Sequence, residues 1–164
     1  MPISPRPRRD MDISRVKLAR RHPLVTSVVS ILREARHLVS QGWTAEAEAV
    51  NAQGKSVSAF DESADSFSAV GAVKRAGFGE GTGGIKRYMR TVIAIGGRVH
   101  RPKGRIALDL LEYVCCERTG ADAKTFNDTC HDGSEIIELL DRVIEESAWH
   151  RRMARWIAKL TKHR

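Results

Sequence analysis

The sequence predicts a mainly α-helical fold, a compact bundle of five to six helices. Apolar residues recur three and four positions apart in several segments, which is the spacing of one face of a helix. Glycine, proline and capping residues separate these segments. A length of 164 residues with 41% apolar residues is typical of one domain with one core. We therefore expect a single helical domain over residues 12–164.

Residues 1–11 are predicted to be a disordered basic arm. Pro2, Pro5 and Pro7 lack backbone N–H donors and disfavour helix. The sequence of residues 12–21 is compatible with a short helix. The basic start of the chain is followed by acidic residues instead of an apolar run, which argues against a secretory signal.

A longer helix is predicted from Pro23 to Gly42. Proline suits the first turn of a helix, and glycine is common just after the last turn. The apolar residues between them share one face: Val25, Val28, Leu32, Ala35 and Val39. The following segment permits a small β-hairpin near residues 44–60, because Asn51-Ala52-Gln53-Gly54 is a turn signal.

The next helix is expected to be capped by Asp61 or Ser63 and to end at Gly77–Gly79. The glycine cluster that follows, Gly79–Gly84, superficially resembles a dinucleotide-binding turn. Such a turn needs a buried strand before it and a helix after it, and here a helical segment precedes it. We interpret the cluster as a flexible linker.

Two more helices are predicted, from Ile85 to Ile95 and from Ile106 to Cys115, the second closed by Gly120. Residues 98–104 between them are expected to be a basic loop, and residues 122–133 a connecting loop. Asp132 and Glu135 are spaced as a capping pair at the start of the last helix. That helix is predicted to reach the C-terminus, unless it bends near Ser147.

The charge is concentrated in three basic segments. Residues 1–22 carry seven Lys and Arg against two acids, and residues 149–164 carry six against none. The total charge is +8, which leaves a net −3 for the residues between these ends. The third basic segment lies within this middle part of the chain, between Gly81 and Leu108, where no acidic residue occurs. The distribution suits contacts with phosphates. It also suits a plain solubility role, or pairing of the basic groups with the acidic residues of the last helix.

These segments favour a non-enzymatic binding protein that engages an anionic partner, a nucleic acid or a nucleoprotein assembly. The expected contacts are Lys86, Arg87, Arg90, Arg98, Arg101, Lys103, Arg105, Arg152, Arg155 and Lys159. One alternative is a protein-interaction module, such as a phage-encoded inhibitor of a host system or a virion component. Its docking stripe on the basic amphipathic C-terminal helix would be Trp149, Met153, Trp156 and Leu160. That stripe is also the pattern of a terminal helix packed on the core.

A small hydrolase or transferase is the third alternative. Cys130 near a histidine, or the carboxylates of Asp61 to Asp65, would supply the chemistry, but capping explains such carboxylates as well. The cysteines lack the paired spacing of a zinc site, and adjacent Cys115 and Cys116 point about 100° apart on a helix. We therefore expect no catalytic residues, cofactor or metal.

Three cysteines do not form a disulfide framework, which predicts reduced thiols and a cytoplasmic protein. No apolar run approaches the roughly 18 to 20 residues of a membrane span.

Two stretches resemble a family of uncharacterised small bacterial and phage proteins. They are Phe67–Ala76, a Gly-Ala-rich helix, and Phe126-Asn127-Asp128, an Asn-Asp loop before a final helix. In that family a Trp-containing segment with a Gly-turned hairpin precedes the first stretch, as Trp43 and Gly54 do here. The resemblance covers about residues 24–146. It implies a helical domain with a small hairpin, and the occurrence of the family in phages implies a host-interaction role. The family often has a cysteine where this chain has Ser68, and no activity is implied.

Overall fold

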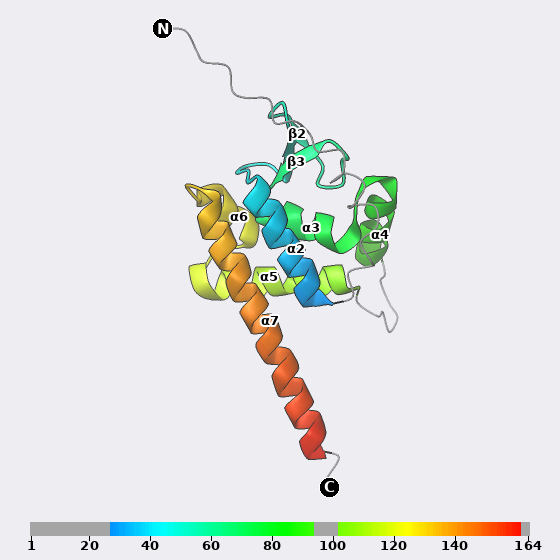
Figure 1. The fold of residues 1–164 in the computed structure, drawn as a ribbon, viewed down its shortest axis with the longest axis vertical. Helices are drawn as coiled ribbons and strands as arrows, with labels where there is room; N and C mark the ends of the chain where they lie inside the picture. Colours follow the sequence, from blue (N-terminus) through cyan, green and yellow to red (C-terminus); the bar gives the residue numbers. More distant parts are fainter. Residues whose placement is uncertain (1–26, 94–101, 162–164) are drawn as a thin grey trace.

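Six helices and three short strands make up the part of the chain that the structure, a computed structural model, describes (Figure 1). It describes the backbone of residues 27–93 and 102–161, and the side chains of residues 27–90 and 102–148. The predicted arm and the short helix over residues 12–21 lie outside these ranges. The elements are α2 (Val28–Gln41), β1 (Ala49–Asn51), β2 (Ser56–Val57), β3 (Ala64–Phe67), α3 (Ala69–Phe78), α4 (Gly81–Ile93), α5 (Lys103–Thr119), α6 (Ala123–Thr129) and α7 (Gly133–Thr161). The predicted mainly α fold with a small hairpin is confirmed.

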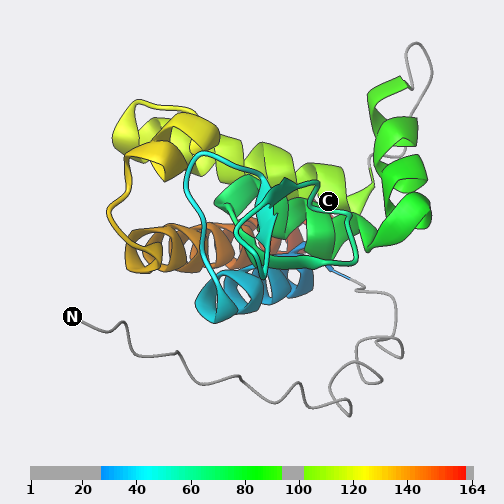
Figure 2. The same cartoon turned by 90° about the horizontal axis from the view of Figure 1, so that it is seen from above.

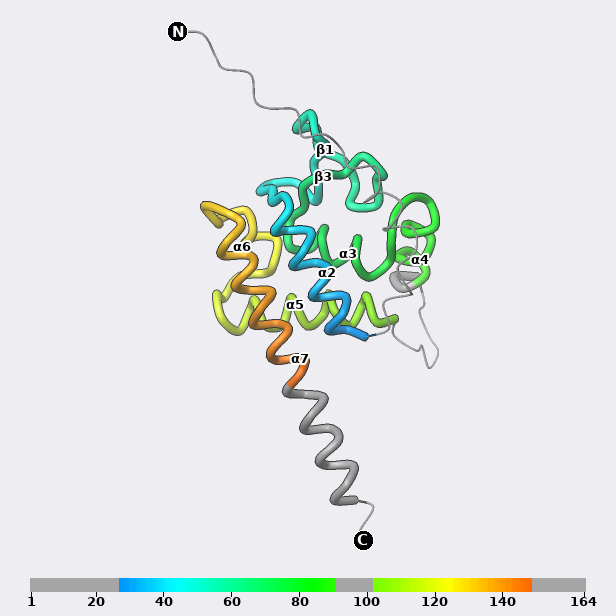
Figure 3. The backbone as a smooth tube through the Cα atoms, in the orientation of Figure 1, coloured from blue at the N-terminus to red at the C-terminus, as the bar shows by residue number. Residues whose placement is uncertain are grey.

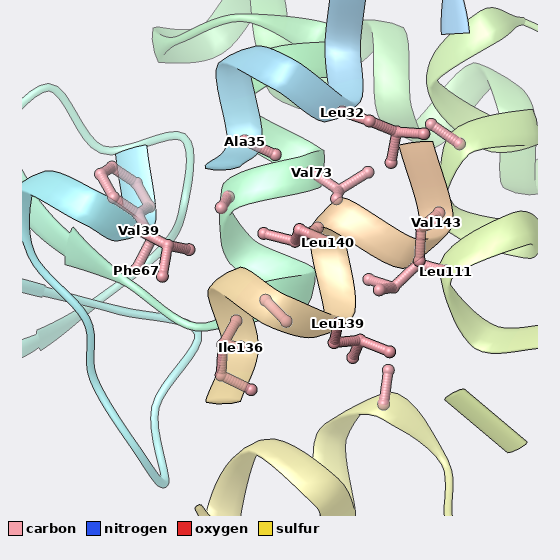
Figure 4. Close-up of a cluster of buried hydrophobic side chains, with 14 of the residues drawn as sticks. Leu32, Ala35, Val39, Phe67, Val73, Leu111, Ile136, Leu139, Leu140 and Val143 are labelled. Carbon is pink, nitrogen blue, oxygen red and sulfur yellow. The ribbon is translucent and has the colours of Figure 1, made fainter. Parts of the chain in front are cut away.

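Helix α2 lies between two other helices, with α7 along one side and α3 along the other (Figures 1 and 3). Helix α5 packs against α3 from below in that view. Fully buried side chains from all four helices meet in one core, shown in Figure 4. They include Leu32, Val73, Leu111 and Leu140. Burying each of these side chains contributes on the order of 1.5–3 kcal/mol.

The hairpin expected near residues 44–60 is present, and it is part of a larger sheet. β1 pairs with β2 in antiparallel fashion through Ala49 and Val57. β1 also pairs with β3, Ala49 lying opposite Phe67, so the strand order is β2-β1-β3. In the turn, the Asn51 side chain accepts hydrogen bonds from the backbone of Gln53 and Lys55.

The helix expected after Asp61 begins later than predicted, because residues 64–67 form strand β3. Ser68, not Asp61 or Ser63, caps α3, and its hydroxyl accepts a hydrogen bond from the Gly71 amide at 3.1 Å. The Asp61 carboxylate instead accepts from the Ser63 amide at 2.8 Å and closes a turn.

Three other predicted boundaries are also wrong. α2 begins at Val28, not Pro23, because the extended backbone of Ser27 caps it. The glycine cluster is not all linker, because α4 begins at Gly81 and takes in Gly83 and Gly84. α5 begins at Lys103, inside the basic loop predicted over residues 98–104.

The connecting loop predicted over residues 122–133 contains helix α6. The Asp122 carboxylate caps this helix by accepting from the Thr125 amide at 2.8 Å. By contrast, the predicted capping pair of α7 is confirmed. The Asp132 side chain accepts from the Ser134 amide at 2.7 Å, and the Glu135 side chain accepts from the His131 amide at 2.9 Å. α7 is one helix to Thr161, with no break at Ser147.

Gly71 is the point where α3 crosses the chain before β1 most closely. A Cβ at Gly71 would lie 2.0 Å from the carbonyl oxygen of Glu48, which is backbone and cannot move aside. The same oxygen accepts hydrogen bonds from both the amide and the hydroxyl of Ser68. Only glycine therefore fits this contact without displacing α3 from the sheet.

We predict that Gly71→Ala destabilises the protein by at least about 2 kcal/mol, because overpacking forces the backbone apart. The matched control is Gly83→Ala, where the Cβ would lie 3.6 Å from the Arg87 guanidinium, an ordinary contact. This control should be neutral or stabilising by up to about 1 kcal/mol, since alanine favours helix. Urea unfolding followed by circular dichroism measures both values. Equal stabilities of the two variants would contradict the described contact.

Candidate functional site

The basic residues expected to contact a partner divide between described and undescribed parts of the chain. Arg98 and Arg101 lie outside the described residues, and no side chain beyond residue 148 is described. The side chains of three further basic contacts, Arg152, Arg155 and Lys159, therefore lie outside the description. So do those of the docking stripe, Trp149, Met153, Trp156 and Leu160. The five remaining contacts are Lys86, Arg87, Arg90, Lys103 and Arg105, on α4 and at the start of α5.

Helix α4 and the start of α5 lie at the same edge of the fold, as both views show (Figures 1 and 2). The close approach of Gly77 and Gly104 places them there, because a Cβ on Gly77 would lie 2.8 Å from the Gly104 Cα. The Phe78 ring covers Gly104 and also meets the Tyr88 ring of α4 edge to face, with centroids 5.3 Å apart. The end of α3 is therefore the common support of the two basic elements.

The five basic side chains differ in how far they are engaged within the protein. Lys86, Arg90 and Lys103 are exposed. Arg87 is anchored, since its Nε donates to the Phe78 carbonyl oxygen at 2.7 Å. Arg105 is paired with Asp109, one turn along α5, at 2.9 Å. Lys86 and Arg90 have no ion-pair partner among the described residues, so their charges face solvent. We name the surface formed by Lys86, Arg90 and Lys103 the basic edge.

Exposed apolar side chains lie on the same two helices. On α4, Ile85 and Met89 are 43% and 44% exposed and sit one turn apart. On α5, Ile106 and Tyr113 are 39% and 57% exposed. Exposed apolar side chains thus occur on both helices that carry the basic edge.

A second feature lies where the segment before β1, the start of α3 and helix α6 meet. A cleft of about 220 Å³ opens there, and its lining includes Ala47, Ser68, Val70, Lys74, Lys124 and Asp128. We name it the α3–α6 cleft. Ser68 is buried and its hydroxyl is committed to hydrogen bonds, donating to the Glu48 carbonyl and accepting from the Gly71 amide. Ser68 is therefore a structural residue in this cleft.

Asn127 holds the walls of the cleft together. Its side chain is 1% exposed, and its amide oxygen accepts from Trp43 Nε1 at 3.1 Å and from the Ala69 amide at 3.0 Å. Its amide nitrogen donates to the Thr44 carbonyl oxygen at 3.0 Å. The sequence pattern predicts Asn127 and Asp128 to lie in a loop before the last helix. They lie instead in α6, and the side-chain contacts of Asn127 join segments distant in the sequence.

The residues considered for catalysis do not form a reactive group. Cys130 is buried, and burial, reinforced by the nearby Glu135 carboxylate, raises the pKa of its thiol to about 11. Burial also raises the pKa of Cys115. Hydrogen bonds from Ser63 lower the pKa of Asp61, which fits its role in the turn. The arrangement does not favour a cysteine nucleophile at neutral pH.

Within the described ranges, no group of three His, Cys, Asp or Glu side chains could hold a metal ion. Among the helices of those ranges, none combines the length and the hydropathy that crossing a bilayer requires.

We predict that Asn127→Ala lowers the free energy of unfolding by about 2–4 kcal/mol, because it leaves buried donors and an acceptor without partners. Asn51→Ala, which removes two hydrogen bonds from an exposed turn, is the matched control. It should cost at least about 1 kcal/mol less. Chemical denaturation gives both values, and a control as damaging as Asn127→Ala would remove the special role of Asn127.

The three thiols should differ in reactivity. Cys116 is exposed, whereas Cys115 and Cys130 are buried. At pH 8, a thiol with a pKa of about 11 has on the order of 100-fold less thiolate than an ordinary one. We predict one fast alkylation by iodoacetamide in the native protein, abolished by Cys116→Ser, and three in guanidinium. Raising the pH should increase the rate at Cys130, because the thiolate is the reactive form. Fast native labelling of Cys130, located by peptide mass spectrometry, would contradict its described burial.

Comparison with known proteins identifies the family to which the chain belongs. Comparisons with curated proteins and with solved structures found no match. A family model described as "Family of unknown function (DUF6197)" matches residues 23–146. This range agrees within one residue at its start with the resemblance found in the sequence, and it includes the basic edge, Asn127 and the α3–α6 cleft. Both basic ends of the chain lie outside it. Because the match spans most of the 164 residues, the chain belongs to this family of unknown function.

Proposed function

We propose that this protein is a binding protein that engages a nucleic acid, or a nucleoprotein assembly, through its basic edge. The observation that carries the proposal is that α4 and the start of α5 share one edge of the fold and expose Lys86, Arg90 and Lys103 there. A surface of this kind suits phosphates, because each neutralised phosphate releases counterions.

The spacing on α4 supports a polymeric partner. Lys86 and Arg90 are four residues apart, so they lie on one helix face with Cβ atoms about 5–6 Å apart. Two long, flexible side chains at this separation can reach neighbouring phosphates of one strand. The sequence adds Arg98 and Arg101 between the two helices, and no acid occurs from Gly81 to Leu108.

The nearby acids are largely committed elsewhere. Glu80, just before α4, pairs with Arg75 at 2.5 Å. Asp109 pairs with Arg105, one turn after Lys103 along α5. Asp141, in the acidic run of α7, pairs with Arg36 of α2 at 2.5 Å. Glu80, Asp109 and Asp141 thus pair with cations other than Lys86 and Arg90, which supports a positive potential on the exposed face of α4.

A protein-interaction module is the second candidate function. The exposed Ile85 and Met89 beside Lys86 and Arg90 favour it, because exposed aliphatic groups next to charges are common at protein interfaces. The two candidates differ in salt dependence, since apolar contacts are far less sensitive to salt than phosphate contacts.

We predict that the full chain binds a random-sequence DNA duplex with an affinity that falls steeply as salt rises. The double variant Lys86→Ala/Arg90→Ala should bind more weakly and flatten the plot of log K against log salt by about 1.8, because two phosphate contacts are lost. Fluorescence anisotropy at several salt concentrations measures this slope.

The matched control is Lys55→Ala/Arg118→Ala, which removes the same charge from exposed residues outside the basic edge. Its slope should stay near that of the parent protein. No DNA binding at low salt, or equal effects of the two double variants, would reject the basic edge as the contact surface.

A further inference from the structure

The α3–α6 cleft is built from segments that side chains hold rigidly in place. The Asp128 carboxylate accepts from the Glu46 amide at 2.9 Å and joins α6 to the segment before β1. Asn127, the preceding residue, joins α6 to the start of α3. The walls are therefore set before any ligand arrives, which lowers the entropic cost of binding.

Glu46 adopts an unusual backbone conformation at the mouth of this cleft. Its φ is +59°, the single positive φ among non-glycine residues of the described chain. A left-handed conformation is disfavoured by about 1–2 kcal/mol for such a residue. The bond from the Glu46 amide to Asp128 helps to stabilise it. The structure thus maintains an uncommon conformation at the cleft opening.

The charges at the cleft fall into two groups. Lys74 and Glu48, whose side chains are 18% and 30% exposed, form an ion pair, and the Lys74 ammonium also lies over the Tyr88 ring. These two charges offset each other. At the opening, Lys124 and Asp128 are four residues apart on α6, yet no ion pair joins them, and Lys124 has no ion-pair partner among the described residues. The lining thus includes the exposed Lys124, Asp128 and Glu46, and within the described chain no ion pair joins Lys124 to either acid.

Ala47, from the segment before β1, and Val70, from α3, are the apolar residues of the lining. The polar Ser68 and Asn127 also line the cleft, and their side chains are engaged in hydrogen bonds within the protein. The volume of about 220 Å³ corresponds to roughly seven waters at about 30 Å³ each. That space suits a molecule of similarly few non-hydrogen atoms and is too small for a nucleotide. A fitting ligand carries both charges close together and has a short aliphatic group.

We propose that the α3–α6 cleft binds a small zwitterion of the aliphatic α-amino acid class. The ligand carboxylate pairs with the Lys124 ammonium, the ligand ammonium pairs with the Asp128 carboxylate, and the aliphatic group contacts Ala47 and Val70. This site is separate from the basic edge, so the proposal does not depend on the proposed nucleic-acid binding, and each is tested by its own experiment.

The experiment is isothermal titration of the full chain with L-valine. Saturable binding is expected, with a Kd on the order of 1 mM or below for a ligand of this size. Two analogues test the charge pattern. Isobutylamine lacks the carboxylate of valine and isovalerate lacks its ammonium, so each should bind at least about tenfold more weakly. No saturable valine binding, or an analogue that binds as tightly as valine, overturns the proposal.

Variants place the ligand in the cleft. Lys124→Met and Asp128→Asn should each weaken valine binding at least about tenfold, since each removes one charge. Asp128→Asn keeps an oxygen that can accept the Glu46 amide, so the fold should be retained, with an unchanged circular dichroism spectrum. Lys55→Met, an exposed lysine in the hairpin turn, is the control and should bind valine as the parent does. Parental binding by both cleft variants would overturn the assignment.

Discussion

The side chain of Asn127 accepts two hydrogen bonds and donates one in the interior of the fold, and much of the rest depends on it. Its partners are Trp43 after α2, Thr44 before β1 and Ala69 at the first turn of α3. A buried amide without partners costs several kcal/mol, so this position is stable only when all three segments are in place. Among the described residues, no buried side-chain polar atom lacks a partner. The amide therefore sets how the sheet, α3 and α6 are joined, and it creates one wall of the α3–α6 cleft.

Close backbone approaches complete this arrangement at both ends of α3. At its start, Gly71 lets α3 meet the carbonyl of Glu48, and at its end Gly77 meets Gly104 of α5. The second contact brings the start of α5 beside α4, so that basic residues from two helices share one edge. The proposed binding surface is thus a consequence of packing at small residues and of aromatic contacts between Phe78 and Tyr88, and not of the charged residues alone.

Local sequence patterns predicted those parts of the fold that local interactions determine. The spacing of Leu32, Ala35 and Val39 identified α2, and the turn residues Asn51 to Gly54 identified the hairpin. Strand β3 was missed because Phe67 also fits a helical stripe, and its pairing with Ala49 is not visible from spacing. Helix α6 was missed because it is short, with few apolar residues to show a period.

The basic edge and the α3–α6 cleft were likewise predicted only as far as local sequence patterns reach. The basic stretch on α4 and α5 was found from composition, but its common edge depends on the contact of Gly77 with Gly104, which are far apart in sequence. The role of Asn127 and the cleft beside it depend on contacts across more than fifty residues, and no spacing rule encodes them. The Asn-Asp pair before the last helix was the one available signal, and it indicated only a loop.

The most direct test of the basic edge is a map of backbone amide shifts in the full chain when a short DNA duplex is added at low salt. The account predicts shifts concentrated in α4 and the first turn of α5, reversed as salt is raised, with the amides around Asn127 unmoved. Shifts centred on α2, α6 or the sheet, or none in α4 at low salt, would contradict it.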